Sequence, residues 1–169
     1  WELYRMMRIE VWKVKNAGYL LQWLDTIGKM EALSSMATFA FNNPDYVYPQ
    51  VAGEPFVFQA KDMGHPLMGR TRCVRNDISM LHRPYFMIVT GANMAGKSTY
   101  LRTVGINYVL ACLGMPVCAR EMCFYPVRLV TSLRTNDSLS ENESYFFAEL
   151  KRLSMILKRL KRGEELFII

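Results

Sequence analysis

The chain has 169 residues, of which 51% are hydrophobic and 21% are charged. That composition suits one packed domain with an attached element, and it excludes wholesale disorder. The 21 Lys and Arg residues outnumber the 15 Asp and Glu residues, which gives a formal charge of +6. This surplus is compatible with an anionic partner but identifies none. No unbroken apolar stretch approaches the roughly 18 residues of a membrane span, so we expect no membrane contact.

The first forty residues carry a helical pattern. Residues 16–18 predict a kink in it, and residues 42–44 predict its end. Its apolar residues recur at three- and four-residue spacing, which predicts one buried helix face. They are Leu20, Trp23, Leu24, Ile27, Leu33, Met36, Ala37 and Ala40.

Two apolar segments predict strands before residue 90. The first covers residues 56–60 and follows a turn at residues 53–55. The second is Tyr85-Phe86-Met87-Ile88-Val89, a continuous apolar run bounded by Pro84 and Gly91. Such a run is typical of a strand buried on both faces of a parallel sheet that helices cover.

From Lys97 onward the apolar period becomes helical, and Gly114 and Pro116 predict where this helix ends. Its predicted apolar face consists of Leu101, Val104, Tyr108, Val109 and Cys112. Further strands are expected near Cys118 and at residues 127–130, and a last helix at about 144–162. Basic residues gather at the end of that helix, and we assign them to a solvated face rather than to DNA contact. Residues 166–169 begin another buried strand.

The four cysteines are Cys73, Cys112, Cys118 and Cys123. They form no C-x-x-C pair, and no histidine cluster lies near them in the sequence. We therefore expect neither a zinc site nor a disulfide framework, and we interpret these residues as reduced thiols in a cytoplasmic protein.

The strongest motif is Gly91-Ala92-Asn93-Met94-Ala95-Gly96-Lys97-Ser98, a full G-x-x-x-x-G-K-S match between a predicted strand and a predicted helix. Glycines let the backbone curl around phosphate oxygens, so that successive N–H groups point inward. The following helix adds its positive dipole end. Lys97 is expected to reach the β- and γ-phosphates, and the Ser98 hydroxyl to bind Mg²⁺. The sequence therefore predicts a P-loop that binds ATP with Mg²⁺.

Hydrolysis requires an acidic residue after a second apolar strand. Leu166-Phe167-Ile168-Ile169 supplies such a strand, and the chain stops where the carboxylates are expected. We therefore interpret the chain as a piece of a longer protein, truncated before the Walker B carboxylates. On this interpretation the 169 residues alone hydrolyse ATP poorly or not at all.

The segment Thr90-Gly91-Ala92-Asn93-Met94-Ala95-Gly96-Lys97-Ser98-Thr99 resembles the T-G-P-N-M-x-G-K-S-T loop of the MutS DNA mismatch-repair ATPases. Tyr100-Leu101-Arg102 continues the resemblance, and Gly64-His65-Pro66 is similar to the family's G-R-H-P element. Residues 137–146 resemble its signature loop D-D-L-x-S-G-x-S-T-F. The resemblance covers about residues 54–169, and more weakly the N-terminal helices resemble the end of the family's lever segment.

This resemblance implies an α/β fold with an ABC-type P-loop sheet flanked by helices. Residues 1–50 are then the helical end of the lever, and residues 51–169 the ATPase domain. It implies a DNA-dependent ATPase that works as a homodimer, is cytoplasmic and lies on the nucleoid when bound to DNA. The nucleotide is held by Gly91 to Thr99. Lys97 and Asn93 act on the phosphates, Asn93 near the γ-phosphate. Ser144 approaches the partner subunit's nucleotide.

The chain departs from the family pattern at several positions. Ala92 replaces a proline, Ser138 replaces the second Asp of the signature loop, and Glu141-Asn142-Glu143 stands where the family has S-G-x. Two carboxylates beside a partner's triphosphate repel it unless a cation intervenes. The family's base-stacking aromatic residue falls near Cys73, so adenine recognition is expected to differ. His65 matches the family's motif, but the sequence does not indicate its role.

Three functions follow as alternatives. The leading hypothesis is the ATPase domain of a DNA mismatch-repair protein. The second is a MutS-like protein that uses ATP as a switch in recombination or on another nucleic acid. The third, an unrelated P-loop kinase, lacks an arginine-rich lid segment in the sequence. The Asn93-Met94-Ala95 segment favours the repair-type loop over the T-G-P-N-T-G-G-K-T of relatives with a nuclease tail.

Overall fold

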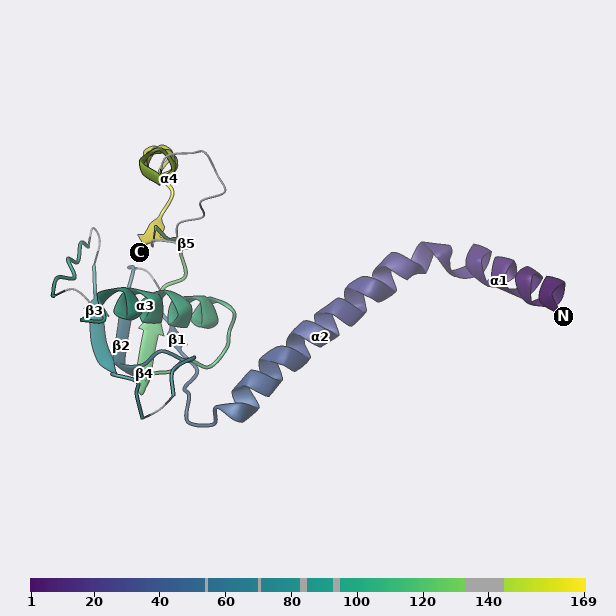
Figure 1. The fold of residues 1–169 in the computed structure, drawn as a ribbon, viewed down its shortest axis with the longest axis horizontal. Helices are drawn as coiled ribbons and strands as arrows, with labels where there is room; N and C mark the ends of the chain where they lie inside the picture. Colours follow the sequence, from purple (N-terminus) through teal and green to yellow (C-terminus); the bar gives the residue numbers. More distant parts are fainter. Residues whose placement is uncertain (54, 70, 83–84, 93–94, 133–144) are drawn as a thin grey trace. The chain divides into compact units, whose positions relative to one another are not determined.

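The structure is a computed structural model that describes residues 1–53, 55–69, 71–82, 85–92, 95–132 and 145–169 (Figure 1). The chain divides into two compact units, residues 1–44 and residues 45–169. The first unit is helical, and the described residues of the second form two small sheets and two helices.

The first unit consists of α1 (Glu2–Asn16), a single 3-10 turn η1 (Ala17–Tyr19) and α2 (Leu20–Asn42). This confirms the predicted helical stretch, its break at residues 16–18 and its end. The predicted buried face is wrong, because neither helix has a buried residue. The two helices follow one another end to end (Figure 1), so neither covers the apolar side chains of the other. Aromatic contacts gather at the bend, where Trp23 stacks on Tyr19 with ring centroids 6.5 Å apart.

A four-stranded sheet forms the centre of the second unit. It consists of β1 (Gln50–Val51), β2 (Phe58–Met63), β3 (Asn76–Met80) and β4 (Glu121–Phe124), in the order β1-β4-β2-β3. β2 is antiparallel to both neighbours, whereas β1 is parallel to β4. Along β2 the side chains of Phe58 and Ala60 are buried on one face. The prediction of a strand at residues 56–60 is therefore confirmed in part, because the strand covers Phe58–Met63.

Helix α3 (Lys97–Cys112) packs on the buried face of this sheet (Figure 1). Tyr108 of α3 lies 5.7 Å from Phe58 and 5.8 Å from Phe124, centroid to centroid. The predicted start of the helix is confirmed, and Gly114 follows its end with φ 72°, a left-handed conformation that favours glycine. The predicted apolar face is partly wrong, because Val109 and Cys112 are exposed. The buried residues are Thr103, Val104, Asn107, Tyr108 and Ala111.

A second, two-stranded parallel sheet pairs β5 (Arg128–Val130) with β6 (Leu166–Ile168), and α4 (Tyr145–Lys161) lies between them in the chain. These elements confirm the strands predicted at residues 127–130 and 166–169 and the last helix. Phe167 joins this sheet to the main core, because its ring lies 4.8 Å from Tyr108 and 5.2 Å from Phe58. The coarse prediction of a mixed α/β fold is thus confirmed.

The strand predicted at residues 85–89 is wrong. The segment has no strand conformation, and Phe86 and Ile88 are 85% and 70% exposed. A strand needs a neighbour that pairs with its N–H and C=O groups. β5 and β6 pair with each other, and a cavity of about 630 Å³ lies between this segment, α3 and β6. Among the described residues, therefore, no strand pairs with this apolar segment.

Candidate functional site

The glycine-rich turn at residues 91–96 leads directly into α3. The N–H of Ala95 donates to the carbonyl of Ala92 at 3.2 Å and closes the turn. Gly96 is the N-cap of α3 with φ 86° and ψ 8°, a left-handed conformation that costs glycine little. Its carbonyl accepts the first helical hydrogen bond, from the N–H of Tyr100 at 2.9 Å. The N–H groups of the first helical turn therefore face the loop, as at any helix N-terminus.

Lys97 folds back over this turn. Its ammonium donates hydrogen bonds to the carbonyl oxygens of Gly91 and Ala92, the second at 2.6 Å. A Cβ at Gly91 would lie 3.9 Å from Cγ and Cδ of Lys97, so the lysine stem runs along the glycine backbone. The turn therefore surrounds a cation with backbone carbonyls. Phosphate oxygens are alternative acceptors for the same ammonium, so this donor set fits a triphosphate.

The first turn of α3 also presents two hydroxyl groups. Ser98 and Thr99 are exposed there, next to the lysine. A hydroxyl oxygen is a hard ligand of the kind that Mg²⁺ accepts. Of the residues predicted to hold the nucleotide, the structure describes these on the turn and the start of α3: Gly91, Ala92, Ala95, Gly96, Lys97, Ser98 and Thr99. Asn93, Met94 and Ser144 lie outside the described residues.

Tyr100 supports this turn from the core side. Its hydroxyl lies 3.5 Å from the carbonyl oxygen of Asp77 in β3. Burial raises the pKa of the Tyr100 phenol above its usual value, and the nearby Tyr85 phenol raises that pKa further. The phenol therefore stays neutral at physiological pH and can donate its proton to the Asp77 carbonyl.

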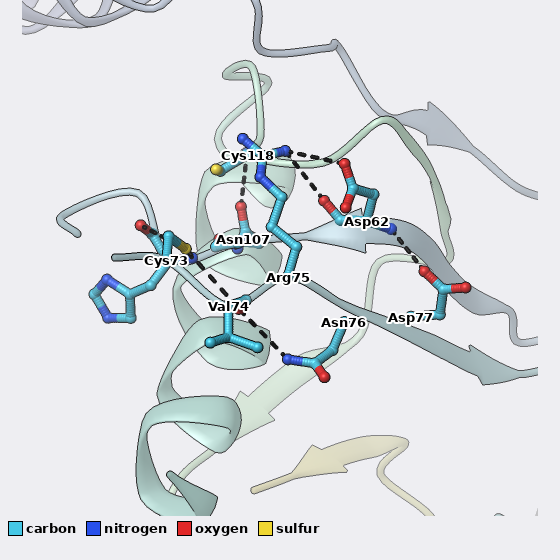
Figure 2. Close-up of polar contacts among 10 residues, drawn as sticks. Asp62, Cys73, Val74, Arg75, Asn76, Asp77, Asn107 and Cys118 are labelled. Atoms are coloured by element: carbon cyan, nitrogen blue, oxygen red, sulfur yellow. Dashed lines mark hydrogen bonds and ion pairs between the residues drawn. The ribbon is translucent and has the colours of Figure 1, made fainter. Parts of the chain in front are cut away.

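Asn107, two turns further along α3, joins the helix to two other segments. Its Nδ2 donates to the carbonyls of Gly64 and Thr103, both at 2.9 Å, and its Oδ1 accepts from the N–H of Cys118 at 2.9 Å (Figure 2). The side chain is 0% exposed. Gly64 also donates its N–H to the carbonyl of Cys118 at 2.7 Å. Asn107 could not be identified from the sequence, because a polar residue in an amphipathic helix is usually assigned to the solvent-exposed face.

The strand that leads to Gly64 contains a bulge at Asp62, whose polar contacts Figure 2 shows. Asp62 has φ 53°, and the pairing of β2 with β3 shifts register between Ala60 and Met63. The carboxylate of Asp77 accepts from the N–H of Asp62 at 2.7 Å, and Nη1 of Arg75 donates to the Asp62 carbonyl at 3.3 Å. These contacts hold a strained residue in place and so fix where the chain enters Gly64.

The Gly64-His65-Pro66 element is a turn fixed by its own hydrogen bonds. Nδ1 of His65 accepts from the N–H of Leu67 at 3.2 Å, and the N–H of His65 donates to the sulfur of Cys73, also at 3.2 Å. Both contacts are local and structural. No described group of three or more His, Cys, Asp or Glu side chains is arranged to hold a metal ion.

None of the described helices is both long and apolar enough to cross a membrane.

Comparison with known proteins adds the family. Residues 87–169 match the model described as MutS domain V. The chain is 32% identical over 172 residues to the DNA mismatch repair protein MutS of Thermotoga sp. (strain RQ2), which covers 99% of this chain and 21% of that protein. It is 32% identical over 161 residues to the protein of the same name from Haloquadratum walsbyi, covering 93% of this chain and 16% of that protein.

A third relative is MutS protein homolog 4 of Homo sapiens, 29% identical over 165 residues, which is 92% of this chain and 17% of that protein. The chain spans about a fifth of the length of the first curated relatives it matches. Because these relatives align with nearly the whole chain and the family model covers the loop and everything after it, this chain belongs to the MutS family.

Proposed function

We propose that this chain is the nucleotide-binding part of a MutS-family protein and binds ATP together with Mg²⁺. The observation that carries the proposal is the position of Lys97, whose ammonium lies inside the glycine-rich turn on the carbonyls of Gly91 and Ala92. In the bound state the ammonium exchanges these carbonyls for phosphate oxygens. The N–H groups at the start of α3 bind the same phosphates.

The other residues of the turn have separate roles in this proposal. Gly91 and Gly96 let the backbone approach the triphosphate, and Asn93 lies near the γ-phosphate. Ser98 holds Mg²⁺, which neutralises charge on the phosphates when bound. Lys97 orients the β- and γ-phosphates. The resemblance adds that Ser144 acts on the nucleotide of a partner subunit.

At the level of the whole protein, we propose a homodimeric, DNA-dependent ATPase with an ABC-type sheet, in which ATP turnover changes DNA binding. Residues 1–50 belong to its lever and residues 51–169 to its ATPase domain. Three features support this: the helical first unit, the P-loop-like turn and the names of the two mismatch-repair relatives.

Titration of this chain with nucleotides tests the binding site. We expect ATP and ADP to bind more tightly with Mg²⁺ than without it, and AMP to bind weakly because it has no β- or γ-phosphate. Ser98→Ala should remove the gain from Mg²⁺ and keep the Mg²⁺-independent binding. Isothermal titration calorimetry measures both.

Ser79→Ala is the matched control, because Ser79 is an exposed serine that belongs to β3 and not to the turn. It should keep the full gain from Mg²⁺. Equal affinity for ATP and AMP, or an unchanged Mg²⁺ gain in Ser98→Ala, contradicts the proposed site.

A second candidate function is an ATP-switched protein that acts in recombination or on a nucleic acid other than a mismatch. The observation that favours it is the 29% identity to MutS protein homolog 4, a relative whose name does not mention mismatch repair and whose identity is close to that of the mismatch-repair relatives.

Duplex binding by the full-length protein separates the two functions. The mismatch-repair proposal predicts tighter binding to a duplex with one mispair than to the matched duplex, measured by fluorescence anisotropy at a stated salt concentration. Equal affinities favour the second candidate. Neither result bears on the ATP site, which the nucleotide titration tests separately.

A further inference from the structure

Two of the four cysteines lie beside the same glycine, although they are far apart in the sequence. A Cβ added at Gly64 would lie 2.9 Å from the sulfur of Cys73 and 3.2 Å from the sulfur of Cys118. The two sulfurs are therefore within about 6 Å of each other, the sum of those distances. Figure 2 shows both cysteines near Asn107. Both thiols are free.

We propose that Cys73 and Cys118 are a dithiol that a small-molecule disulfide, such as oxidised glutathione, converts into an intramolecular disulfide across Gly64. This site is independent of nucleotide binding. The thiols are expected to be reduced under ordinary conditions, and the proposal describes their reaction when the surroundings become oxidising.

Backbone hydrogen bonds fix the two segments that contain the cysteines. On one side, Cys118 accepts from the N–H of Gly64 at 2.7 Å and donates its own N–H to Asn107 at 2.9 Å. On the other side, the N–H of Cys73 donates to the carbonyl of Gly69 at 3.1 Å. To form a disulfide, the two sulfurs must move into bonding distance across Gly64 by side-chain rotation and whatever backbone shift the bond geometry requires.

Position 64 requires a glycine because the two sulfurs approach it closely. Its backbone conformation is not the reason, since its φ is not positive. A side chain at this position would have to displace one or both sulfurs. The glycine therefore leaves open the space that a sulfur–sulfur bond would occupy.

The two thiols differ in access. Cys73 is partly exposed, and its sulfur accepts a hydrogen bond from the N–H of His65 at 3.2 Å. The nucleophile in disulfide exchange is a thiolate, and it must be reachable by the incoming disulfide. Cys118 is 3% exposed, so a bulky disulfide reaches Cys73 first.

The reaction then has two steps. The Cys73 thiolate attacks one sulfur of oxidised glutathione, forms a mixed disulfide and releases one glutathione thiolate. The Cys118 thiolate attacks the Cys73 sulfur, forms the protein disulfide and releases the second glutathione. Two protein thiols are oxidised, one glutathione disulfide is reduced to two thiols, and the two protons pass through water.

The test uses the full chain with Cys112→Ser and Cys123→Ser, which leaves only the two cysteines in question. The folded protein is incubated with excess oxidised glutathione, quenched with acid, alkylated and weighed by mass spectrometry. We expect a product that is lighter by two hydrogens, carries no glutathione and no alkyl group, and yields a peptide that links residue 73 to residue 118. Two alkylated thiols, or glutathione retained on Cys73, would overturn the proposal.

Three controls sharpen this result. In urea the same variant should accumulate glutathione adducts instead of the crosslink, and equal crosslinking there would show that the fold does not pair the thiols. Gly64→Ala should slow crosslinking, because its Cβ displaces the Cys73 sulfur. Gly69→Ala, in the same loop with nothing within 4 Å of the added Cβ, should crosslink at the original rate. Equal rates in both glycine variants would contradict the role of Gly64.

Discussion

Replacing Lys97 with alanine is expected to weaken ATP binding by at least about 100-fold. The ammonium donates two hydrogen bonds within the turn, to Gly91 and Ala92, and in the proposed complex it donates to phosphate oxygens instead. Each hydrogen bond to a charged group contributes about 1.5–3 kcal/mol, and about 1.4 kcal/mol corresponds to a factor of ten in affinity. Calorimetric titration of Lys97→Ala with ATP and Mg²⁺ measures the loss.

Two further variants show whether charge or position is responsible. Lys158→Ala removes the same charge from an exposed position on α4, and it should bind ATP like the original chain. Lys97→Arg keeps the charge but places a planar guanidinium where two carbonyls hold a compact ammonium, so it should also bind weakly. ATP affinity unchanged in Lys97→Ala, while circular dichroism shows a folded protein, would reject the P-loop assignment.

The turn at residues 91–98 and the start of α3 were predictable because they depend on local chemistry. Gly96 occupies a left-handed N-cap position, and Lys97 begins the helix, as the G-x-x-x-x-G-K-S spacing requires. Gly114 marks the helix end through its positive φ. Each of these features depends on residues within a few positions of one another, so the sequence alone contains the necessary information.

Residues 85–89 show where local pattern is insufficient. Their composition predicts a buried strand, but strand formation depends on a pairing partner elsewhere in the chain. Phe86 and Ile88 are instead exposed. The helical first unit makes the same point, because its spacing predicts a helix correctly while its burial depends on what packs against it.

Contacts between segments that are distant in the chain also could not be predicted from local sequence patterns. Asn107 bonds to Gly64 and Cys118, which belong to separate loops. No spacing rule relates positions 73 and 118, so the proximity of these cysteines to Gly64 emerged only from the structure. The cysteine spacing predicted the absence of a metal motif, but it contained no information about which thiols meet in space.

Asn107→Ala is expected to destabilise the fold by about 2–6 kcal/mol. The substitution leaves the carbonyl of Gly64 and the N–H of Cys118 without the partner that Asn107 supplies, and each buried unpaired group costs about 1–3 kcal/mol. Since small domains are stable by only about 5–15 kcal/mol, this is a large fraction of the total. Urea denaturation followed by circular dichroism measures the change in the free energy of unfolding.

Thr103→Val is the matched control one turn earlier on α3. Thr103 is 5% exposed, and its hydroxyl donates only to the carbonyl of Thr99 within the same helix, at 2.8 Å. Losing that local bond should cost about 1 kcal/mol. If Asn107→Ala costs no more than this control, Asn107 does not hold the Gly64 and Cys118 segments to the helix.

Asn107→Asp adds a pH dependence whose sign follows from burial. The aspartate keeps an acceptor for the Cys118 N–H, but burial disfavours its charged form and raises its folded-state pKa above the unfolded value. Its stability is therefore highest below the unfolded pKa and falls as pH rises through the folded pKa. The original asparagine does not titrate, so a stability difference between the two proteins that stays constant from acid to neutral pH would contradict the buried, hydrogen-bonded position of residue 107.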